Sequence, residues 1–282
     1  MAVVEGSEVA IHLDPGADAL TESTRFDVGS VAKTFTALLL AQLVVAGELG
    51  LDEPIGGHLD AGPNGAITFL QLATHTSGLP RLPPNLMAKA AQSPDDPYRD
   101  YTPDDLLEAL RSTPATPGDR EYSNFGYMVL GAALAAAGGA PYGTLLGHRV
   151  LEPLRLRETG LGFDGVADRA HGYAGAERVP DWTLQVPGPG GMTSCIADMA
   201  RYVRANLAPD ETPLETALVL AQRPFAWVEE GDVLWHNGGA GGFGAMVAFD
   251  RSKGRGIAVL AGRPHSLVID EAALRALRAP PA

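Results

Sequence analysis

The sequence predicts an α/β fold in which a central antiparallel sheet carries flanking helices and the middle of the chain forms an inserted all-helical region. Strand-like segments occur near both ends of the chain, and helices separated by Pro-rich and Gly-rich loops fill the middle. We therefore expect a discontinuous sheet domain of residues 1–50 and 186–282, with residues 51–185 as the helical region. The cleft between two such parts is a common place for an active site.

The first fifty residues predict a β-hairpin followed by a buried helix. Residues 3–13 (VVEGSEVAIHL) place Val and Ile on both sides of Gly6, which is typical of two short strands joined by a tight turn. Apolar residues cover every helical face over residues 31–46, which indicates a helix surrounded by protein. The apolar stretch 35–49 is shorter than the roughly 18 residues that a membrane span requires.

The middle of the chain predicts helices with recognisable ends. The segment YTPDDLLEALRS places Thr102 and Pro103 at the start of a helix, and the segment beginning at Asn124 ends on two glycines, which stop helices. Residues 81–97 contain several prolines and no helical period, so we expect an irregular surface loop there.

The last hundred residues predict two helices, four strands and a final helix. The helices are expected over 196–207 and 213–222. Val-rich and aromatic runs on either side of Glu230-Gly231 and of residues 252–254 indicate consecutive antiparallel strands joined by tight turns. A helix over 267–277 closes the chain.

Composition excludes several classes of partner. The formal net charge of -13 argues against nucleic acid and against an anionic membrane surface, since both attract clustered Lys and Arg. The single cysteine, Cys195, has no companion for a disulfide or a metal site, and we expect no metal and no cofactor. No basic segment with an apolar core precedes Arg25, so we expect no export signal and a cytoplasmic location. The expected partner is a small-molecule or short peptide substrate, and the oligomeric state stays open.

Ser30 and Lys33 lie one helical turn apart at the start of the predicted buried helix. A lysine in a partly dry position has a depressed pKa and can accept the proton of a serine on the same helical face, which activates a weak nucleophile. A Ser-x-x-Lys match occurs by chance about once in a chain of this length. The alternative is a serine that caps the helix and a lysine that extends to solvent along its own stem.

Two further segments carry candidate functional residues. Tyr122-Ser123-Asn124 stands at the start of a predicted helix, where Ser and Asn are also ordinary caps. His236-Asn237-Gly238 ends a predicted strand and leads into a glycine-rich stretch, which either lets another backbone approach closely or forms a bulge.

The three segments in this order, Ser30-Val31-Ala32-Lys33, Tyr122-Ser123-Asn124 and His236-Asn237-Gly238, closely resemble the motifs of the serine β-lactamase and penicillin-binding superfamily. The Tyr-x-Asn and His-x-Gly forms resemble its class C-like branch of esterases, D-aminopeptidases and carboxypeptidases. The strings THTSGLP (74–80) and HNGGAGGF (236–243) are also family-like. The resemblance covers residues 3–262 and implies a β-lactamase/transpeptidase-like fold.

The resemblance also implies roles for these residues. Ser30 would be the nucleophile, Lys33 would assist its deprotonation, and Tyr122 would carry the proton to the leaving group. Asn124 would hold Lys33 and the amide of the acyl group. The family's oxyanion hole would consist of the backbone N–H groups of Ser30 and Gly239, next to Gly238 in the substrate-binding strand.

His236 replaces the lysine of true β-lactamases at this position. A histidine is mostly neutral at neutral pH, so the resemblance favours neutral esters and amides over substrates that carry a carboxylate there, with weak β-lactamase activity still open. His75 is expected to be structural, and Trp235 and Tyr127 to pack rather than bind substrate. A helix packed on the sheet before the first strand is usual in the family, whereas this sequence starts at that strand. Either the start codon is misassigned, or one face of the sheet is covered otherwise.

The function expected is that of a serine hydrolase acting on an ester or amide through an acyl-enzyme. An acyltransferase or peptide cyclase uses the same acyl-enzyme but admits an amine or alcohol in place of water. A ligand sensor on a catalytically inactive fold is the third reading, and the presence of all three motifs argues against it.

Overall fold

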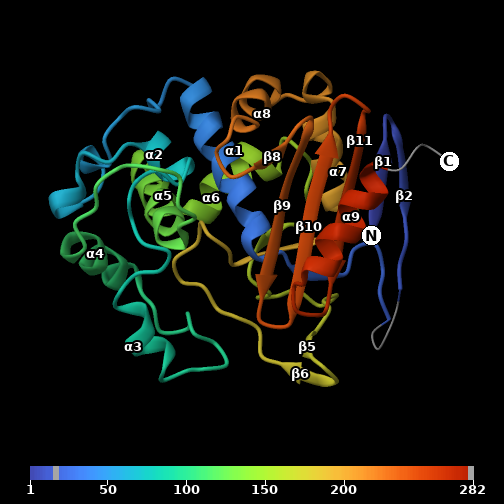
Figure 1. The fold of residues 1–282 in the computed structure, drawn as a ribbon, viewed down its shortest axis with the longest axis horizontal. Coiled ribbons are helices and arrows are strands. Elements are labelled where there is room, and N and C mark those ends of the chain that lie inside the picture. The colour runs from blue at the N-terminus through green and yellow to red at the C-terminus, as the bar shows by residue number, and fades with distance from the viewer. Residues whose placement is uncertain (15–18, 279–282) are drawn as a thin grey trace.

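A six-stranded antiparallel sheet lies at the centre of the computed structural model, which describes residues 1–14 and 19–278 (Figure 1). The strand order is β2-β1-β11-β10-β9-β8. The strands are β1 (Ala2–Glu5), β2 (Glu8–Ile11), β8 (Val228–Glu230), β9 (Val233–Ala240), β10 (Phe243–Asp250) and β11 (Arg255–Ala261). The hairpin at the N-terminus and the strands at the C-terminus therefore form one sheet, as the sequence predicts.

Pairing between β1 and β11 brings the two ends of the chain together. Val3 lies opposite Ile257 in the antiparallel register. The central strand β10 is buried along its whole length, so it carries apolar residues on both faces rather than an alternating pattern. Both faces of the sheet must then be covered by helices.

One helix covers each face of the sheet (Figure 1). α9 (Leu267–Arg278) packs on β10 and β11 on one side, and α7 (Ile196–Leu207) packs on β11, β1 and β10 on the other. Beyond α7, α8 (Glu215–Ala221) packs against α1 (Ala32–Val45). The C-terminal helix α9 and the helix α7 thus cover opposite faces of the sheet.

α1 is the buried helix that the apolar pattern predicts. Eleven of its fourteen residues are buried, and Lys33 is among them. A 3₁₀ turn, η1 (Gly29–Val31), precedes it and places Ser30 directly at its start. The chain approaches this turn through β3 (Arg25–Asp27), which pairs with β7 (Met192–Cys195) in a second, smaller sheet.

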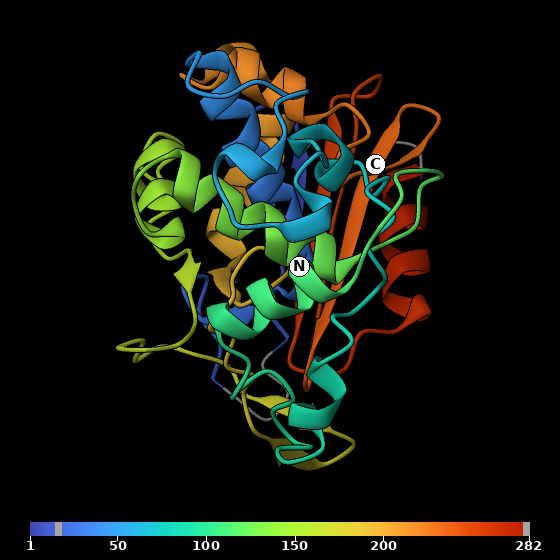
Figure 2. The same ribbon diagram turned by 90° about the vertical axis from the view of Figure 1, so that its left-hand side faces the viewer.

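The middle of the chain contributes helices on the far side of α1 from the sheet (Figures 1 and 2). They are α2 (Phe69–Ala73), α3 (Leu86–Ala90), α4 (Pro103–Ser112), α5 (Asn124–Ala137) and α6 (Tyr142–Leu146), with a π-helical turn η4 (Gly147–Leu151). α4 starts as expected, because Thr102 Oγ1 accepts the Asp105 N–H while the Asp105 carboxylate accepts the Thr102 N–H. Short 3₁₀ turns occur at Ile55–Gly57, Gly62–Asn64 and Pro209–Glu211.

The prediction that residues 51–185 are all-helical is wrong over one stretch. β4 (Gly160–Leu161) joins the sheet of β3 and β7, and β5 (Gly172–Ala174) forms a hairpin with β6 (Glu177–Val179). These strands are two or three residues long, too short to show a period of two. β4 forms by pairing with the distant strand β7, whereas β5 and β6 pair with each other. The loop 81–97 likewise contains the short helix α3.

The division into a discontinuous sheet domain and a helical region stays a prediction. Residues 15–18 and 279–282 of the predicted sheet domain lie outside the described residues. Among the described helices, none is by itself long and apolar enough to cross a membrane. α5 and the segment Tyr142–Leu151 meet that test only together, with a bend of 79° between them. Nine residues of α5 are buried, as is usual for a core helix.

Candidate active site

Ser30 lies in a turn whose backbone conformation exposes its side chain to other functional groups. Gly29, directly before it, has a φ of 50°, in the left-handed region that favours glycine. The Ser30 hydroxyl makes no capping bond to the helix that follows. The alternative of a helix-capping serine is therefore excluded, and the Ser30 Oγ is available for other partners.

Two side chains donate hydrogen bonds to the Ser30 Oγ. The Lys33 Nζ lies 3.0 Å from it and the Tyr122 hydroxyl 2.8 Å from it. Lys33 is fully buried, so it does not extend to solvent. The structure thus brings together the three residues for which the sequence predicts catalysis, from the start of α1 and from the segment before α5.

The electrostatic environment of Lys33 favours its neutral form. Burial lowers its pKa well below the ordinary value, and the positive charge of Arg81 lowers it further. The other partner of the Nζ is the backbone carbonyl of Pro189 at 2.8 Å, which accepts a hydrogen bond without supplying negative charge. A neutral amine can donate to Pro189 and still accept the proton of Ser30 through its lone pair.

The environment of Tyr122 favours the protonated form of its hydroxyl group. Burial raises the pKa of its hydroxyl, against the hydrogen bond to Ser30 and the positive charge of Arg81. Its ring stacks on His75 with centroids 4.8 Å apart, and the Arg81 Cζ lies 5.1 Å from the ring centroid. Burial thus shifts Tyr122 toward its protonated form and Lys33 toward its neutral form, which suits Lys33 to accept a proton and Tyr122 to donate one.

Ser123, the middle residue of the second motif, has a structural role, and its contacts position Tyr122 and Asn124. The Ser123 hydroxyl caps α5, since it accepts the Gly126 N–H at 2.8 Å. The Ser123 N–H donates to His75 Nδ1 at 3.0 Å. His75 thus plays the structural part expected of it, because it fixes the backbone between Tyr122 and Asn124.

Asn124 does not hold Lys33 as the resemblance implies. Lys33 donates to Ser30 and Pro189, and the Oδ1 of Asn124 is buried with no hydrogen-bond partner. A buried carbonyl oxygen without a partner is costly, so a ligand that supplies a donor gains free energy there. Asn124 lines the cleft in front of Ser30, where such a donor would enter.

The third motif lies on β9, whose residues alternate between two faces. Trp235 packs in the cluster formed with α9, and Asn237 donates from its side chain to Asp270 of that helix at 2.7 Å. His236 and Gly238 therefore point to the opposite face, toward Ser30. Trp235 packs away from the cleft, and the Tyr127 hydroxyl donates to the Ala73 carbonyl, so both pack as expected.

β9 passes so close to the Ser30 turn that only glycine fits. A Cβ on Gly238 would lie 2.1 Å from the Val28 carbonyl oxygen and 2.8 Å from the Ser30 nitrogen. A Cβ on Gly29 would lie 2.6 Å from the Gly239 nitrogen. The amide groups of Ser30 and Gly239 thus belong to one backbone contact between the turn and the strand.

The strand register directs the Gly239 N–H away from β10. A two-residue loop joins Ala240 to its partner Phe243, and such a closing pair exchanges hydrogen bonds. The next pair, Gly239 with Gly244, is then of the non-hydrogen-bonded type. β8 pairs with β9 only as far as Trp235, so this edge of β9 is open beside the Ser30 turn. This is the place expected for an oxyanion hole.

His236 is buried and uncharged. Burial lowers its pKa, and the positive charge of Arg120 lowers it further, to about 3. Its Nδ1 lies 2.6 Å from the Asn237 carbonyl oxygen, which only accepts, so Nδ1 carries the proton. The sequence predicts a neutral histidine here, and the environment makes it neutral over a wider pH range than an exposed imidazole.

Sequence reasoning missed three features of the site. Pro189 acts through a backbone carbonyl, which leaves no signal in the residue type, and Arg81 lies in a loop with no motif. Asp27 accepts the Gly29 N–H at 2.7 Å, and burial raises the pKa of its carboxyl group to about 7. The string Phe26-Asp27-Val28 reads as an ordinary edge of a strand, so nothing in it marks this contact.

The cleft in front of Ser30 is narrow. Asn124, Tyr98, Trp182 and Leu184 line it, and its volume is about 60 Å³, against roughly 300–1,000 Å³ for typical small-molecule sites. Its two walls are connected, because Trp182 Nε1 donates to the Asp95 carbonyl and the rings of Tyr98 and Trp182 lie 5.6 Å apart. The loop 81–97 thus adjoins the cleft through Asp95.

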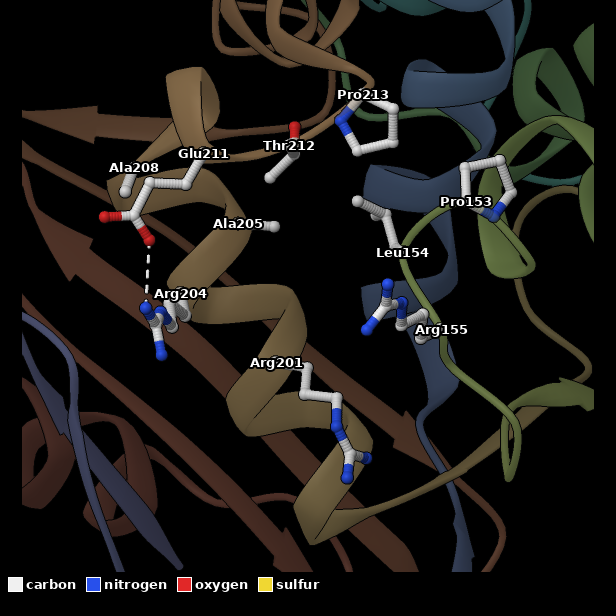
Figure 3. A pocket seen from close by; sticks show the side chains of 10 residues that line it. All are labelled: Pro153, Leu154, Arg155, Arg201, Arg204, Ala205, Ala208, Glu211, Thr212 and Pro213. Carbon is white, nitrogen blue, oxygen red and sulfur yellow. Dashed lines mark hydrogen bonds and ion pairs between the residues drawn. The ribbon is translucent and has the colours of Figure 1, made fainter.

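A separate cavity of about 450 Å³ lies between α7 and residues 153–155 (Figure 3). It shares no lining residue with the catalytic cleft. Of its arginines, Arg204 pairs with Glu211 at 2.9 Å, the dashed contact in Figure 3, and Arg201 pairs with Asp198 at 2.7 Å. It contains no nucleophile and base in contact, so it is not the candidate site. Within the described residues, no cluster of three His, Cys, Asp or Glu side chains could hold a metal ion.

An antiparallel sheet covered by helices, with Ser, Lys and Tyr in contact beside its strand β9, defines the class of serine β-lactamases and penicillin-binding proteins, in its class C-like branch. A model of the Beta-lactamase family matches residues 1–279, and the chain belongs to that family. A class C beta lactamase from Rhodobacter sphaeroides has the same fold, with a TM-score of 0.81 and 24% identity over 98% of this chain and 92% of that one.

Curated relatives carry two kinds of name. A "Beta-lactamase" of Escherichia coli K12 is 32% identical over 72% of this chain and 54% of its own length. The "D-alanyl-D-alanine-carboxypeptidase/endopeptidase AmpH" of the same organism is 32% identical over 65% and 49%. A "Beta-lactamase" of Pseudomonas fluorescens is 29% identical over 87% and 81%. The chain thus spans about half the length of the first two relatives.

Proposed function

We propose that this protein is a serine hydrolase that forms an acyl-enzyme on Ser30 and cleaves a neutral ester or amide. The observation that carries the proposal is that Lys33 and Tyr122 both contact the Ser30 Oγ, at 3.0 and 2.8 Å. Nucleophile, base and proton donor then meet at one oxygen.

The proposed acylation step uses the opposite pKa shifts of Lys33 and Tyr122. Neutral Lys33 takes the proton of Ser30 as the Oγ attacks the carbonyl carbon of the substrate. The negative charge that develops on the carbonyl oxygen is stabilised by the N–H groups of Ser30 and Gly239. Tyr122 gives its proton to the leaving group as the bond to the carbonyl carbon breaks, and it recovers a proton from Lys33.

Deacylation repeats these steps with water. A water molecule gives its proton to the base and its oxygen attacks the acyl carbon, and Ser30 leaves with a proton. The unpartnered Oδ1 of Asn124 accepts a hydrogen bond from the N–H of an amide-bearing acyl group. An amine or alcohol in place of water would give acyl transfer through the same intermediate.

The neutral state of His236 supports the choice of substrate. Lysine at this position offers a permanent charge to a carboxylate, whereas a neutral imidazole does not. Arg81 stacks on Tyr122, with its Cζ 5.1 Å from the ring centroid, and it does not line the cleft in front of Ser30. Neutral esters and amides therefore suit the cleft better than carboxylated substrates such as cephalosporins.

A panel of substrates tests the proposal. Wild type and Ser30→Ala would be compared on p-nitrophenyl acetate, a D-amino-acid anilide and a chromogenic cephalosporin, with a graded amine added to measure the ratio of transfer to hydrolysis. We expect turnover of the ester or anilide by wild type alone, and slower turnover of the cephalosporin. No turnover of any neutral substrate, or equal turnover by Ser30→Ala, would contradict the proposal.

A further inference from the structure

Leu184 lines two cavities, the narrow catalytic cleft and a larger one of about 470 Å³. The larger cavity lies among α4, α5, α6 and residues 184–187. Most of its walls are aliphatic, and none of its lining residues is charged; the aliphatic side chains include Leu59, Leu106, Leu107, Ala132, Ala135 and Leu161. In a chain with a net charge of -13, an uncharged cavity of this size is a distinct chemical environment.

Two polar side chains in the walls of this cavity already have partners. The Tyr142 hydroxyl bonds to Thr36 Oγ1 at 2.8 Å, and the Gln185 side-chain amide donates to the Arg99 carbonyl at 2.6 Å. An occupant therefore meets mostly hydrocarbon at the aliphatic walls. Such walls recognise a ligand by burying its apolar surface. The volume of the cavity lies within the range of ligand pockets, roughly 300–1,000 Å³.

The catalytic cleft is small and open to solvent, with a volume of about 60 Å³ beside Ser30. The part of a long substrate beyond the reacting group must lie outside this volume. Tyr122 delivers the proton to the leaving group in the proposed mechanism, and it does not line the part of the cleft that Leu184 lines. The leaving group then departs toward Tyr122, and the acyl group extends on the side of Leu184.

We propose that the apolar cavity beyond Leu184 is an acyl-chain site, and that the preferred substrates are esters or amides of medium-length aliphatic acids whose chains pass Leu184 into it. This inference rests on the proposed function. The chain replaces water at the walls formed by α4, α5 and α6, and the carbonyl carbon stays at Ser30.

A series of p-nitrophenyl esters from acetate to decanoate tests the site through the dependence of kcat/KM on chain length. Each methylene group that enters the cavity should raise kcat/KM by up to about fourfold. Ala135→Phe fills the cavity from α5, and it should lower the decanoate to acetate ratio by about tenfold or more while the acetate rate stays unchanged. Ala136→Phe adds the same ring on the exposed side of α5 and should leave the ratio as in wild type.

A second variant guards against loss of folding. Leu161 lines the cavity at its rim and is 39% exposed, so Leu161→Glu should fold while it places a charge beside the chain. Leu161→Glu should therefore also lower the ratio of kcat/KM for decanoate to that for acetate. Equal ratios in wild type, Ala135→Phe, Leu161→Glu and Ala136→Phe, with acetate still hydrolysed, would overturn the acyl-chain site and leave the hydrolase intact.

A binding measurement separates the two proposals. The Ser30→Ala variant should bind the uncharged dye Nile red, and 1-decanol should displace the dye. The double variant Ser30→Ala/Ala135→Phe should bind both compounds more weakly, whereas Ser30→Ala/Ala136→Phe should bind them as Ser30→Ala does. If this pattern holds while wild type hydrolyses no ester, the apolar site stands and the proposed reaction fails. If decanol binds equally to all three proteins, the cavity is not an acyl-chain site.

Discussion

Gly238 and Val28 are in direct backbone contact, and a Cβ on Gly238 would lie only 2.1 Å from the Val28 carbonyl oxygen. This contact sets the separation between β9 and the Ser30 turn, and with it the position of the two amide groups proposed as the oxyanion hole. Backbone atoms on both sides leave no flexible side chain that could move aside. The contact therefore gives a direct test of the oxyanion geometry.

Gly238→Ala should push β9 away from Ser30 and lower kcat by about 10²- to 10³-fold, as the loss of one oxyanion donor does. The free energy of unfolding should fall by about 1–3 kcal/mol from the overpacking. Gly57→Ala is the matched control, because no atom lies within 4 Å of its added Cβ. Ester kinetics and urea unfolding measure both effects, and an active Gly238→Ala enzyme would show that Gly239 is not an oxyanion donor.

Lys33→Met and Tyr122→Phe should not have independent effects. Both side chains contact the Ser30 Oγ, and the proton must pass through both on its way to the leaving group. Each single variant should lose most of the activity, and the double variant should be little slower than the worse single one. A double-mutant cycle on kcat/KM for one ester checks this, and purely multiplicative losses would mean that the two residues act separately.

Asp27 should make the stability of the protein depend on pH. Burial raises the pKa of its carboxyl group from 3.8 to about 7, against the hydrogen bond from Gly29 and with some contribution from Asp181. The folded state then binds a proton more tightly than the unfolded state, so the contribution of this group is complete below about pH 3.8 and is lost as pH rises toward 7.

Asp27→Asn keeps an oxygen that accepts the Gly29 N–H but cannot ionise. The variant should therefore gain stability relative to wild type as pH rises from about 4 to about 7, by up to a few kcal/mol. Urea unfolding of both proteins at several pH values isolates this residue, since the other groups cancel in the difference. A difference that does not change with pH would mean that Asp27 is ionised in the folded protein throughout.

His236→Lys should move the preference of the enzyme toward carboxylated substrates. A charge-assisted hydrogen bond contributes about 1.5–3 kcal/mol, which corresponds to roughly 10- to 150-fold in the ratio of kcat/KM between a carboxylated and a neutral substrate. Because the pKa of His236 is lowered to about 3, the wild-type ratio should stay flat between about pH 5.5 and 8, around the ordinary pKa of histidine. A wild-type ratio that rises as pH falls would show that His236 becomes charged in this range.

Much of the fold follows from local patterns in the sequence. The N-terminal hairpin, α1 and the strands β9 to β11 carry long apolar or β-branched runs, and their ends lie where glycine and polar residues predict them. The strands over 160–179 could not be found this way, because two or three residues carry no period. β4 forms through pairing with the distant residues Thr193 and Met192, and β5 and β6 pair with each other in a short hairpin.

The site divides in the same way. Ser30, Lys33 and Tyr122 are found from motif spacing, since catalysis needs those side chains. The partner of Lys33 was predicted wrongly as Asn124, because the actual partner is the backbone carbonyl of Pro189, which any residue could supply. Asp27 and Asp270 reach the site only because the fold brings them there, and no motif spacing in the sequence predicts their contacts with it.

Labelling with a fluorophosphonate tests the central claim most directly, because it reports covalent chemistry at Ser30 whatever the natural substrate is. Intact-protein and peptide mass spectrometry should show one adduct per chain, on the peptide that contains Ser30. Ser30→Ala should show none, and Lys33→Met should react far more slowly because the base is missing. No adduct on wild type, or an adduct at another residue that persists in Ser30→Ala, would contradict the account.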